Sequence, residues 1–496
     1  MGSPSSERLR VVGLGGLFVL ALVVGLELAR PFRSASIAFD SQVAVIHFDR
    51  IVNGRHLEQF LSTTPKPLLT FIYGPIHALT GDWRPIAWAA IVAYGLAIAG
   101  VGAVVGRVAG SAAGAFSALA VLASPTLLFD VGFALATPWA LLGWVAAGLA
   151  LTAERPRYSL AGLALLLATL ARLETLILVA LALAVLVGSH IARRPAPRRA
   201  WLVPLIGFGA LLVMAAHDYL LSGNPLLWST VAIRYTGATT LHVDSPVEVL
   251  AFLIGRYAAV GAVSLLAVIG VLRLLARRQF VLAFGLIGLG PGVAAFLVFL
   301  ALRGIFVSER YAAAIDIAVA AAAGIALGGT SFDVLEWIGS RTPRLAASPT
   351  LGVVAAAVAA VFITWPHGPL DVTLRTQVRT SLESGVDTDR AEGVIRTALA
   401  TTTSQPVPAV YVPTTVRPRV TIDLGLTLPQ VGSTDRLTVA DAGLKAGQII
   451  VHDRRAEGRP DALSALELTT ATTIGEVSVE PLLVDPSRGL WVLAVR

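Results

Sequence analysis

Long apolar runs, separated by short polar segments, fill the chain up to about residue 365. A helix needs roughly 20 apolar residues to cross the hydrocarbon core of a bilayer. We therefore predict a mainly α fold, a polytopic helical membrane bundle with about eleven spans. The stretch 159–190 fits either two short helices or one broken helix. The predicted spans cover residues 11–29, 85–106, 111–128, 132–152, 159–171, 175–190, 201–221, 249–272, 280–302, 312–328 and 349–365.

The charges between the spans predict an orientation. Short cytoplasmic loops of membrane proteins are enriched in Lys and Arg, and every second predicted loop carries Arg. We therefore place the N-terminus in the cytoplasm and the C-terminus outside. The first span resembles a signal peptide, but residues 27–31 form a poor cleavage site, so we expect it to be retained. The Arg residues of these loops are Arg107, Arg155, Arg157, Arg193, Arg194, Arg198, Arg199, Arg273, Arg277, Arg278, Arg341 and Arg344.

Composition agrees with a chain that lies mostly in lipid. Hydrophobic residues make up 55% of the sequence and charged residues only 14%, whereas soluble domains are about one quarter charged. The chain has no cysteine, which excludes disulfides, thiolate metal sites and a cysteine nucleophile. We assign the net charge of +7 to topology and to contact with anionic membrane lipids. We expect no nucleic acid partner.

The first outside loop, residues 30–84, is the richest mixture of acids, bases and turn residues in the first half of the chain. Asp40 is its first acid, about ten residues beyond the first span. Residues 42–61 have apolar positions at helical spacing, which predicts one or two amphipathic helices on the membrane surface. Pro65 and Pro67 end them, and residues 68–79 then return toward the membrane.

The tail differs in character, with more charges and shorter apolar runs. We divide the chain into a membrane module, residues 1–365, and a small extracytoplasmic α/β domain, residues 366–496. We find no phosphate-binding loop, zinc spacing or nucleophile motif in this domain. Its role is left open between substrate shielding, acceptor docking and packing. The predicted elements are strands at 407–413, 418–426, 447–453 and 490–496, and a helix at 388–400 capped by Thr388 or Asp389.

Reactions on the outer face of a membrane have neither ATP nor nucleotide sugars, so they need a donor that arrives in the bilayer, such as a polyprenyl-phosphate-linked sugar. Transfer of that sugar requires a general base for the acceptor hydroxyl and a positive site for the leaving phosphate. A carboxylate with nearby Arg or Lys at the membrane face provides both.

Five segments, in this order and on one face, resemble motifs of the GT-C class of polyprenol-dependent glycosyltransferases, including the protein O-mannosyltransferase and aminoarabinose-transferase branch. They cover roughly residues 1–365. The segments are FDSQ at 39–42, TPKPLLTFIYGP at 64–75, TLARLETLIL at 169–178, YLLSGNPLLWS at 219–229 and ERYAAAIDIA at 309–318. The resemblance implies an inverting glycosyltransferase of the bacterial cytoplasmic membrane. Its expected partners are a polyprenyl-phosphate-linked sugar donor and a glycan, lipid or protein acceptor.

The sequence departs from this family pattern at three positions. Many members have paired acids in the first motif, whereas here Ser41 follows Asp40. One proline of the Lys-Pro-Pro-Leu element is missing, and Leu173 replaces the proline of the Arg-Pro-Glu turn. No cofactor is assigned, and binding of a divalent cation is left open.

Two carboxylates are candidates for catalytic roles, Asp40 through the resemblance and Asp130 through its position. We expect Asp40 to be the general base, the alternative being a cap within its loop. Asp130, just after a span, is expected beside Asp40, because an intramembrane carboxylate is costly unless it is exposed or paired. Asp49 either lies on a solvated helix face or contacts the acceptor or a metal.

The expected substrate-binding residues carry similar alternatives. Lys66 either binds the donor phosphate or faces lipid headgroups. Arg172 and Glu174 form either a structural ion pair or a carboxylate-positioned guanidinium that reaches phosphate. Arg310 and Tyr311 have the same two interpretations. His47, His56 and His77 show no ligand spacing, and we interpret them as surface or packing residues.

Two other functions compete with glycosyl transfer. A transporter or flippase of a lipid-linked or polar substrate typically has internal repeats and broken helices at the bilayer midplane, and we detect no repeat here. A non-catalytic scaffold for cell-wall assembly, with the tail as its interaction module, is the third class. Convergence of Asp40, Lys66, Asp130, Arg172 and Arg310 at one outward site favours the enzyme, and a polar path across the membrane favours transport.

Overall fold

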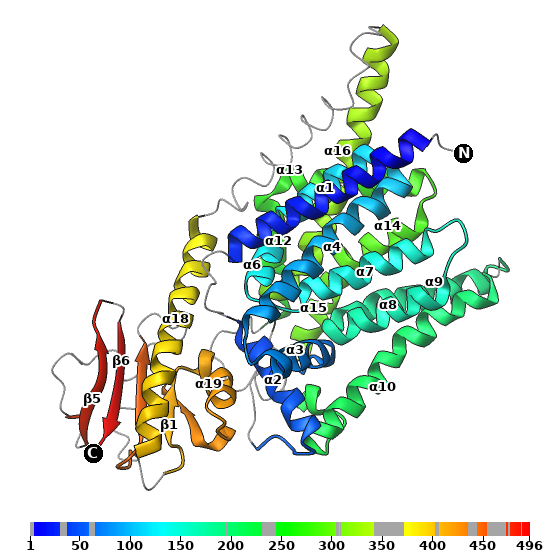
Figure 1. Cartoon of the computed structure of the whole chain (residues 1–496). Helices are drawn as coiled ribbons and strands as arrows, with labels where there is room; N and C mark the ends of the chain where they lie inside the picture. The colour runs from blue at the N-terminus through cyan, green and yellow to red at the C-terminus, as the bar shows by residue number, and fades with distance from the viewer. Residues whose placement is uncertain are drawn as a thin grey trace.

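The chain forms a helical bundle with a small mixed α/β unit at one end, the end where α2 (Phe39–Val52) and α3 (Pro67–Thr80) also lie (Figure 1). The N-terminus lies at the other end of the bundle. This computed structural model describes residues 4–29, 37–58, 65–194, 196–230, 245–303, 307, 309–341, 372–401, 406–434, 444–453, 473–474, 477–487 and 489–496.

Each predicted span up to residue 328 falls on a helix or on helices joined at a break. The last one, 349–365, lies outside the described residues. Within the described ranges, four helices are long and apolar enough to cross a membrane, or up to six if each bent pair is one span. The total of eleven therefore stays a prediction. The helices are α1 (Pro4–Ala29), α4 (Arg84–Ala109), α5 (Ser111–Leu122), α6 (Pro125–Gly132), α7 (Thr137–Leu151), α8 (Tyr158–Ala171), α9 (Leu176–Ile191), α10 (Leu202–Ser222), α12 (Pro246–Ala259), α13 (Gly261–Ala276), α14 (Phe280–Ile287), α15 (Val293–Leu302) and α16 (Ala313–Arg341).

The stretch 159–190 consists of two helices, α8 and α9, which are separated by Arg172 and a short 3₁₀ turn, Leu173–Thr175. Two further pairs bend sharply, by 61° between α5 and α6 and by 93° between α12 and α13. Proline stands in the first turn of α6 and of α12, where its missing N–H has no helical partner to lose. These breaks place polar residues at helix ends.

Small residues let α16 and α5 approach backbone to backbone. A Cβ added at Gly324 would lie 2.5 Å from the Cα of Ser117, and one at Gly328 would lie 2.4 Å from the Cα of Ala113. The four-residue spacing on both helices is the small-xxx-small pattern of close helix pairs in membranes. This seam therefore fixes the start of α16, which follows Tyr311, close to the α5–α6 pair.

The first loop folds into two packed helices, α2 (Phe39–Val52) and α3 (Pro67–Thr80). A helix predicted within 42–61 is present as α2, whose Val43 and Ile46 are buried, and residues 59–61 lie outside the described part. Its placement on the membrane surface stays a prediction. Lys66 is the N-cap residue of α3 and Pro67 its first residue, as expected from the fixed φ of proline. The helix ends at Gly81, whose φ of 62° is left-handed.

The C-terminal unit contains a six-stranded sheet with the order β2-β1-β3-β6-β5-β4. Strand β1 is parallel to both β2 and β3, and the remaining pairs are antiparallel. Helix α18 (Val372–Thr401) packs against this sheet through Ala391 and Ile395. The strands are β1 (Val410–Val412), β2 (Val431–Ser433), β3 (Ile449–Asp453), β4 (Thr473–Ile474), β5 (Val477–Asp485) and β6 (Leu490–Val495).

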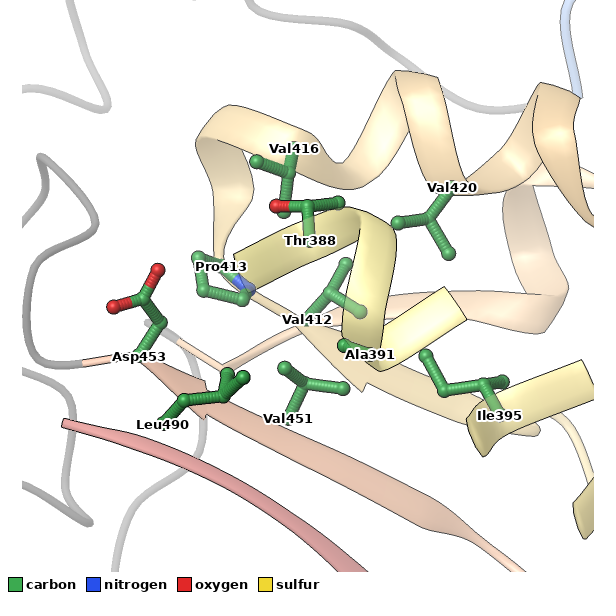
Figure 2. A pocket seen from close by; sticks show the side chains of 10 residues that line it. All are labelled: Thr388, Ala391, Ile395, Val412, Pro413, Val416, Val420, Val451, Asp453 and Leu490. Atoms are coloured by element: carbon green, nitrogen blue, oxygen red, sulfur yellow. The ribbon is translucent and has the colours of Figure 1, made fainter. Parts of the chain in front are cut away.

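The small pocket of Figure 2 lies in the seam between α18 and the sheet. Most of its lining is aliphatic, and Thr388 and Asp453 are its polar residues. We therefore interpret it as a packing seam.

Two predictions for this unit are wrong. Residues 418–426 do not form a strand, because Arg417–Asp423 is the short helix α19, followed by a turn. A helix lets Val420 face the sheet core while Ile422 packs toward α2, so tertiary packing overrides the β-propensity of this stretch. The helix predicted at 388–400 already begins at Val372, so Thr388 and Asp389 lie inside it and cap nothing.

Candidate functional site

Asp40 and Lys66 form an ion pair at the exposed edge of the first loop. Asp40 lies in the first turn of α2, and the Nζ of Lys66 donates to its Oδ2 over 3.0 Å. Both side chains are about one fifth exposed, 21% and 22%. A carboxylate and an ammonium group therefore lie together where a ligand can reach them.

The connection between α6 and α7 anchors this pair. The backbone N–H of Ala38 donates to the carbonyl of Phe133 over 3.1 Å. The carbonyl of Ala134 accepts from the hydroxyl of Ser41 over 2.8 Å and from that of Tyr73 over 2.9 Å. Ala38 and Ser41, on either side of Asp40, are thus hydrogen-bonded to the α6–α7 connection. Tyr73 bonds α3 to the same connection.

That same loop is flanked by a buried polar cluster. The fully buried Asp130, near the end of α6, accepts from the hydroxyl of Thr137 through Oδ2, which lies 3.4 Å from Nη1 of Arg172. Arg172 also donates to Thr137 and pairs with Glu174, and Tyr311 interacts with it electrostatically. The structural ion pair is therefore the interpretation of Arg172 and Glu174 that the geometry favours. Contact with a phosphate stays a prediction.

The two basic turns lie close together. Leu68, two residues after Lys66, packs in one apolar cluster with Leu170 and Leu173, which flank Arg172. Arg310 belongs to the 3₁₀ turn Glu309–Ala312 that precedes α16, but its side chain is outside the described part, and its role stays a prediction.

Asp49 does not join this site. It lies nine residues after Asp40 on α2, and 100° per residue puts the two on opposite faces of the helix. Its carboxylate pairs with Arg50 and accepts from Asn53 Nδ2 over 3.0 Å. Asp49 therefore has local partners, and its contact with acceptor or metal stays a prediction.

Sequence reasoning missed a second buried cluster behind Lys66. In α10, the Nδ1 of His217 lies 3.3 Å from Asp218, and its Nε2 lies 3.2 Å from the hydroxyl of Thr70 in α3. Asp218 also accepts the backbone N–H of Trp228 over 2.8 Å, which holds the following loop. An ionisable pair within a membrane-length apolar helix is a functional-site signal that was present in the sequence.

His47 completes this cluster, and it is buried in packing rather than lying at the surface. Its ring lies edge-on to His217, with centroids 5.8 Å apart. Burial lowers the pKa of His47 well below its usual value, and the nearby His217 and Lys66 lower it further. His47 is therefore neutral at physiological pH.

A third cluster joins three helices. Arg256 of α12 makes two bonds to Asp316 in the first turn of α16, 3.1 Å from Nε and 2.6 Å from Nη2. Thr126 of α6 and Tyr257 donate to the same carboxylate. A bidentate arginine–carboxylate pair gives directional as well as electrostatic stability, so this cluster fixes α12 and α16 to α6.

Among the described residues, no group of three or more His, Asp or Glu is arranged to hold a metal ion. We therefore derive no step of the chemistry through a metal.

The bundle, its two packed loop helices and the small mixed-sheet unit share their overall fold with solved structures of GT-C glycosyltransferases. The chain superposes on apo ArnT of Cupriavidus metallidurans with a TM-score of 0.58, covering 98% of both chains at 16% identity. ArnT bound to undecaprenyl phosphate gives 0.55 over 99% of this chain and 98% of that one, also at 16% identity. The oligosaccharyltransferase of Archaeoglobus fulgidus, tethered with an acceptor peptide, gives 0.55 over 89% of this chain and 69% of that one, at 14% identity.

At these identities the likeness shows the fold, and the predicted resemblance is confirmed at that level. No family model matches the sequence. No curated protein matches it either.

Proposed function

We propose that this protein transfers a sugar from a polyprenyl-phosphate donor to an acceptor on the outer face of the bacterial cytoplasmic membrane. The observation that carries the proposal is the Asp40–Lys66 pair, 3.0 Å apart and partly exposed. It lies in a chain that shares the fold of ArnT, a protein whose structure holds undecaprenyl phosphate. The N-terminus is cytoplasmic and the C-terminal domain extracytoplasmic in this proposal.

The chemistry is a single inverting displacement. Asp40 accepts the proton of the acceptor hydroxyl while the oxygen of that hydroxyl bonds to the anomeric carbon of the sugar. The bond between that carbon and the phosphate oxygen breaks, and the polyprenyl phosphate leaves. Lys66 stabilises the charge that develops on the phosphate. Because the two groups are in contact, a phosphate held by Lys66 lies beside the base.

Asp130 has a supporting role in this scheme. Its side chain has no exposed surface, so it cannot touch a substrate as the chain is folded here. With Thr137, Arg172 and Glu174 it holds the α6–α7 connection to which Ser41 and Tyr73 are bonded. We therefore propose that this cluster orients Asp40 rather than acting on the sugar.

Asp40→Asn tests the proposal, because it keeps the size of the side chain but removes the proton acceptor. Loss of a positioned base costs typically 10²–10⁴-fold in rate, and donor binding should persist. Asp49→Asn is the matched control, the same change on the opposite face of α2, and should keep most of the parent activity. The assay measures transfer and donor binding separately with purified protein and a panel of polyprenyl-phosphate sugars. Transfer by Asp40→Asn at the parent rate would refute the assignment.

The geometry gives less support to a transporter. The described clusters around Asp40, Asp130 and His217 are joined through α2, α3 and the α6–α7 connection. They gather where those elements meet rather than following one helix across the bundle. We therefore propose no transport function.

A further inference from the structure

The C-terminal domain rests on the helix that carries Asp40. Its short helix α19 packs against α2. Val43 and Ile46 of α2 form one buried cluster with Leu428, and Ile422 packs at its edge. The apolar contact joins the two parts of the chain directly at the candidate catalytic helix.

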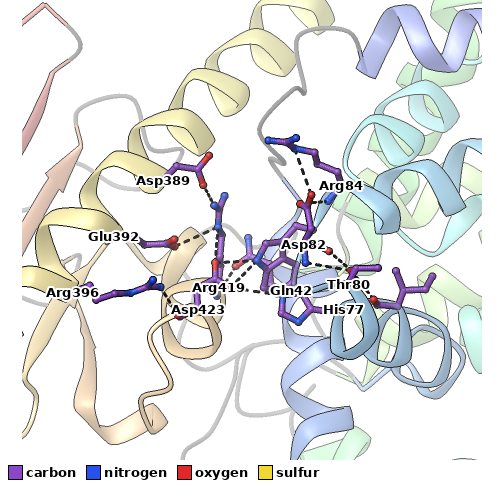
Figure 3. Close-up of polar contacts among 12 residues, drawn as sticks. Gln42, His77, Thr80, Asp82, Arg84, Asp389, Glu392, Arg396, Arg419 and Asp423 are labelled. Carbon is purple, nitrogen blue, oxygen red and sulfur yellow. Dashed lines mark hydrogen bonds and ion pairs between the residues drawn. The ribbon is translucent and has the colours of Figure 1, made fainter.

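One hydrogen bond fixes the register of this contact. The backbone N–H of Arg419 donates to Oε1 of Gln42 over 3.1 Å (Figure 3). The Nε2 of Gln42 in turn donates to the carbonyl of Ile37 over 2.6 Å, just before α2 begins. Gln42 lies two residues after Asp40, so its buried amide links the start of α2 to α19.

The guanidinium of Arg419 joins α19 to α18 within the C-terminal domain. It pairs with Asp389 and lies 3.5 Å from Glu392, both on α18, and 3.2 Å from Asp423 in α19. The Arg419 side chain is only 6% exposed. A buried arginine with several carboxylate partners is costly to disrupt, because removing it leaves like charges facing one another.

Asp423 continues the chain of contacts to the other loop helix. Both of its oxygens accept from Nε1 of Trp83 over 3.0 Å, and one lies 3.7 Å from Nε2 of His77. His77 belongs to the last turn of α3, and Trp83 precedes α4. The four-residue cluster of Asp389, Glu392, Arg419 and Asp423 therefore contacts both α2 and the α3–α4 connection (Figure 3).

We propose that the C-terminal domain is a positioning element for the Asp40–Lys66 pair, with Arg419 and Gln42 as its positioning residues. They touch neither donor nor acceptor in this scheme. They hold α2 and α3 in the relative placement that puts the base beside the phosphate site. The predicted effect on kcat rests on the proposed glycosyl transfer. The predicted effect on the placement of α2 relative to the C-terminal domain does not.

Arg419→Gln is the first test variant and Arg419→Lys the conservative one, since lysine keeps a cation among the three acidic side chains. Arg390→Gln is the matched control, because Arg390 forms a 44% exposed ion pair with Asp485 in the same domain and has no contact with α2 among the described residues. Gln42→Met leaves the domain itself unchanged and serves if Arg419→Gln fails to fold.

Two readouts separate positioning from folding. Displacement of reacting groups by about 1 Å can cost 10²-fold in rate, so kcat should fall by about ten- to a hundredfold in Arg419→Gln and Gln42→Met with the donor KM unchanged. Arg419→Lys should recover part of the lost kcat.

Because the chain has no cysteine, spin labels attached at Val52→Cys and Ala400→Cys report the distance between α2 and α18 and no other distance. The distribution of distances between the two labels should broaden in Arg419→Gln and stay narrow in Arg390→Gln.

A narrow distribution and parent kcat in both Arg419→Gln and Gln42→Met would overturn the proposal. Equal losses in Arg390→Gln would overturn it too, because the effect would then be general destabilisation. If the parent protein transfers no sugar from any donor, the proposed function fails, and the label distances alone decide whether the domain positions α2.

Discussion

A methyl group added at Gly74 should separate α2 from α3. Gly74 lies in the middle of α3, and a Cβ built there falls 2.1 Å from both Cβ and Cγ of Phe48. Those atoms lie next to the α2 backbone, so rotation of the phenyl ring does not relieve the clash. Ordinary contact begins at 3.4 Å, and the helices must therefore separate locally by about 1.3 Å, the difference between these two distances.

The expected magnitudes follow from that displacement. Overpacking costs about 1–3 kcal/mol, and replacing a mid-helix Gly by Ala returns about 1 kcal/mol. Gly74→Ala should thus lower the unfolding free energy by about 0–2 kcal/mol. The rate should suffer more, because Asp40 and Lys66 sit on the two separated helices and a shift of about 1 Å can cost 10²-fold. Thermal unfolding and single-turnover transfer with the same preparation measure both quantities.

Gly188→Ala is the control for this experiment. It is also a helical glycine, in α9, and no atom lies within 4 Å of its added Cβ. It should keep the parent rate and gain up to about 1 kcal/mol of stability. A Gly74→Ala protein with the parent rate would show that α2 and α3 need not be held so closely, and the reasoning would fail.

Two further predictions concern stability. Burial raises the pKa of Glu392 to about 8, with Asp423 and Asp389 adding to the effect and Arg419 opposing it. The folded state thus holds a proton that the unfolded chain releases near pH 4.5. Unfolding free energy should therefore fall between pH 4.5 and 8, by at most about 1.4 kcal/mol per pH unit, and Glu392→Gln should flatten the slope in denaturation series. Tyr73→Phe should cost about 1–3 kcal/mol by denaturation, because the hydroxyl bonded to Ala134 and Trp139 is buried, and an unchanged midpoint would contradict it.

The sequence predicted the parts of the fold that depend on local patterns. Hydropathy located the membrane-length helices, because lipid requires long apolar segments wherever they occur. Pro67 begins α3, since proline favours the first turn of a helix, whereas Pro65 and Pro67 were predicted only to end the preceding helices. The proximity of Asp40 and Lys66 was predicted only by resemblance, because a separation of 26 positions along the chain carries no distance information.

Tertiary contacts explain what was missed. Residues 418–426 contain a strand-like run, but α19 needs two apolar sides, one for the sheet and one for α2. His217 and Asp218 are adjacent in sequence, yet their partners Thr70 and Trp228 come from other segments. No spacing rule links such positions, so the sequence displays the His217–Asp218 pair but not its partners.

The hydrogen bond between Gln42 and Arg419 joins positions 377 residues apart, and this separation orders events during synthesis. At about 5–20 residues per second, a ribosome needs roughly 20–75 s to reach Arg419 after it has made Gln42. The helices of the bundle can enter the bilayer and pack during that interval. The helix that carries Asp40 therefore gains its contact with α19 only after nearly the whole chain has been made.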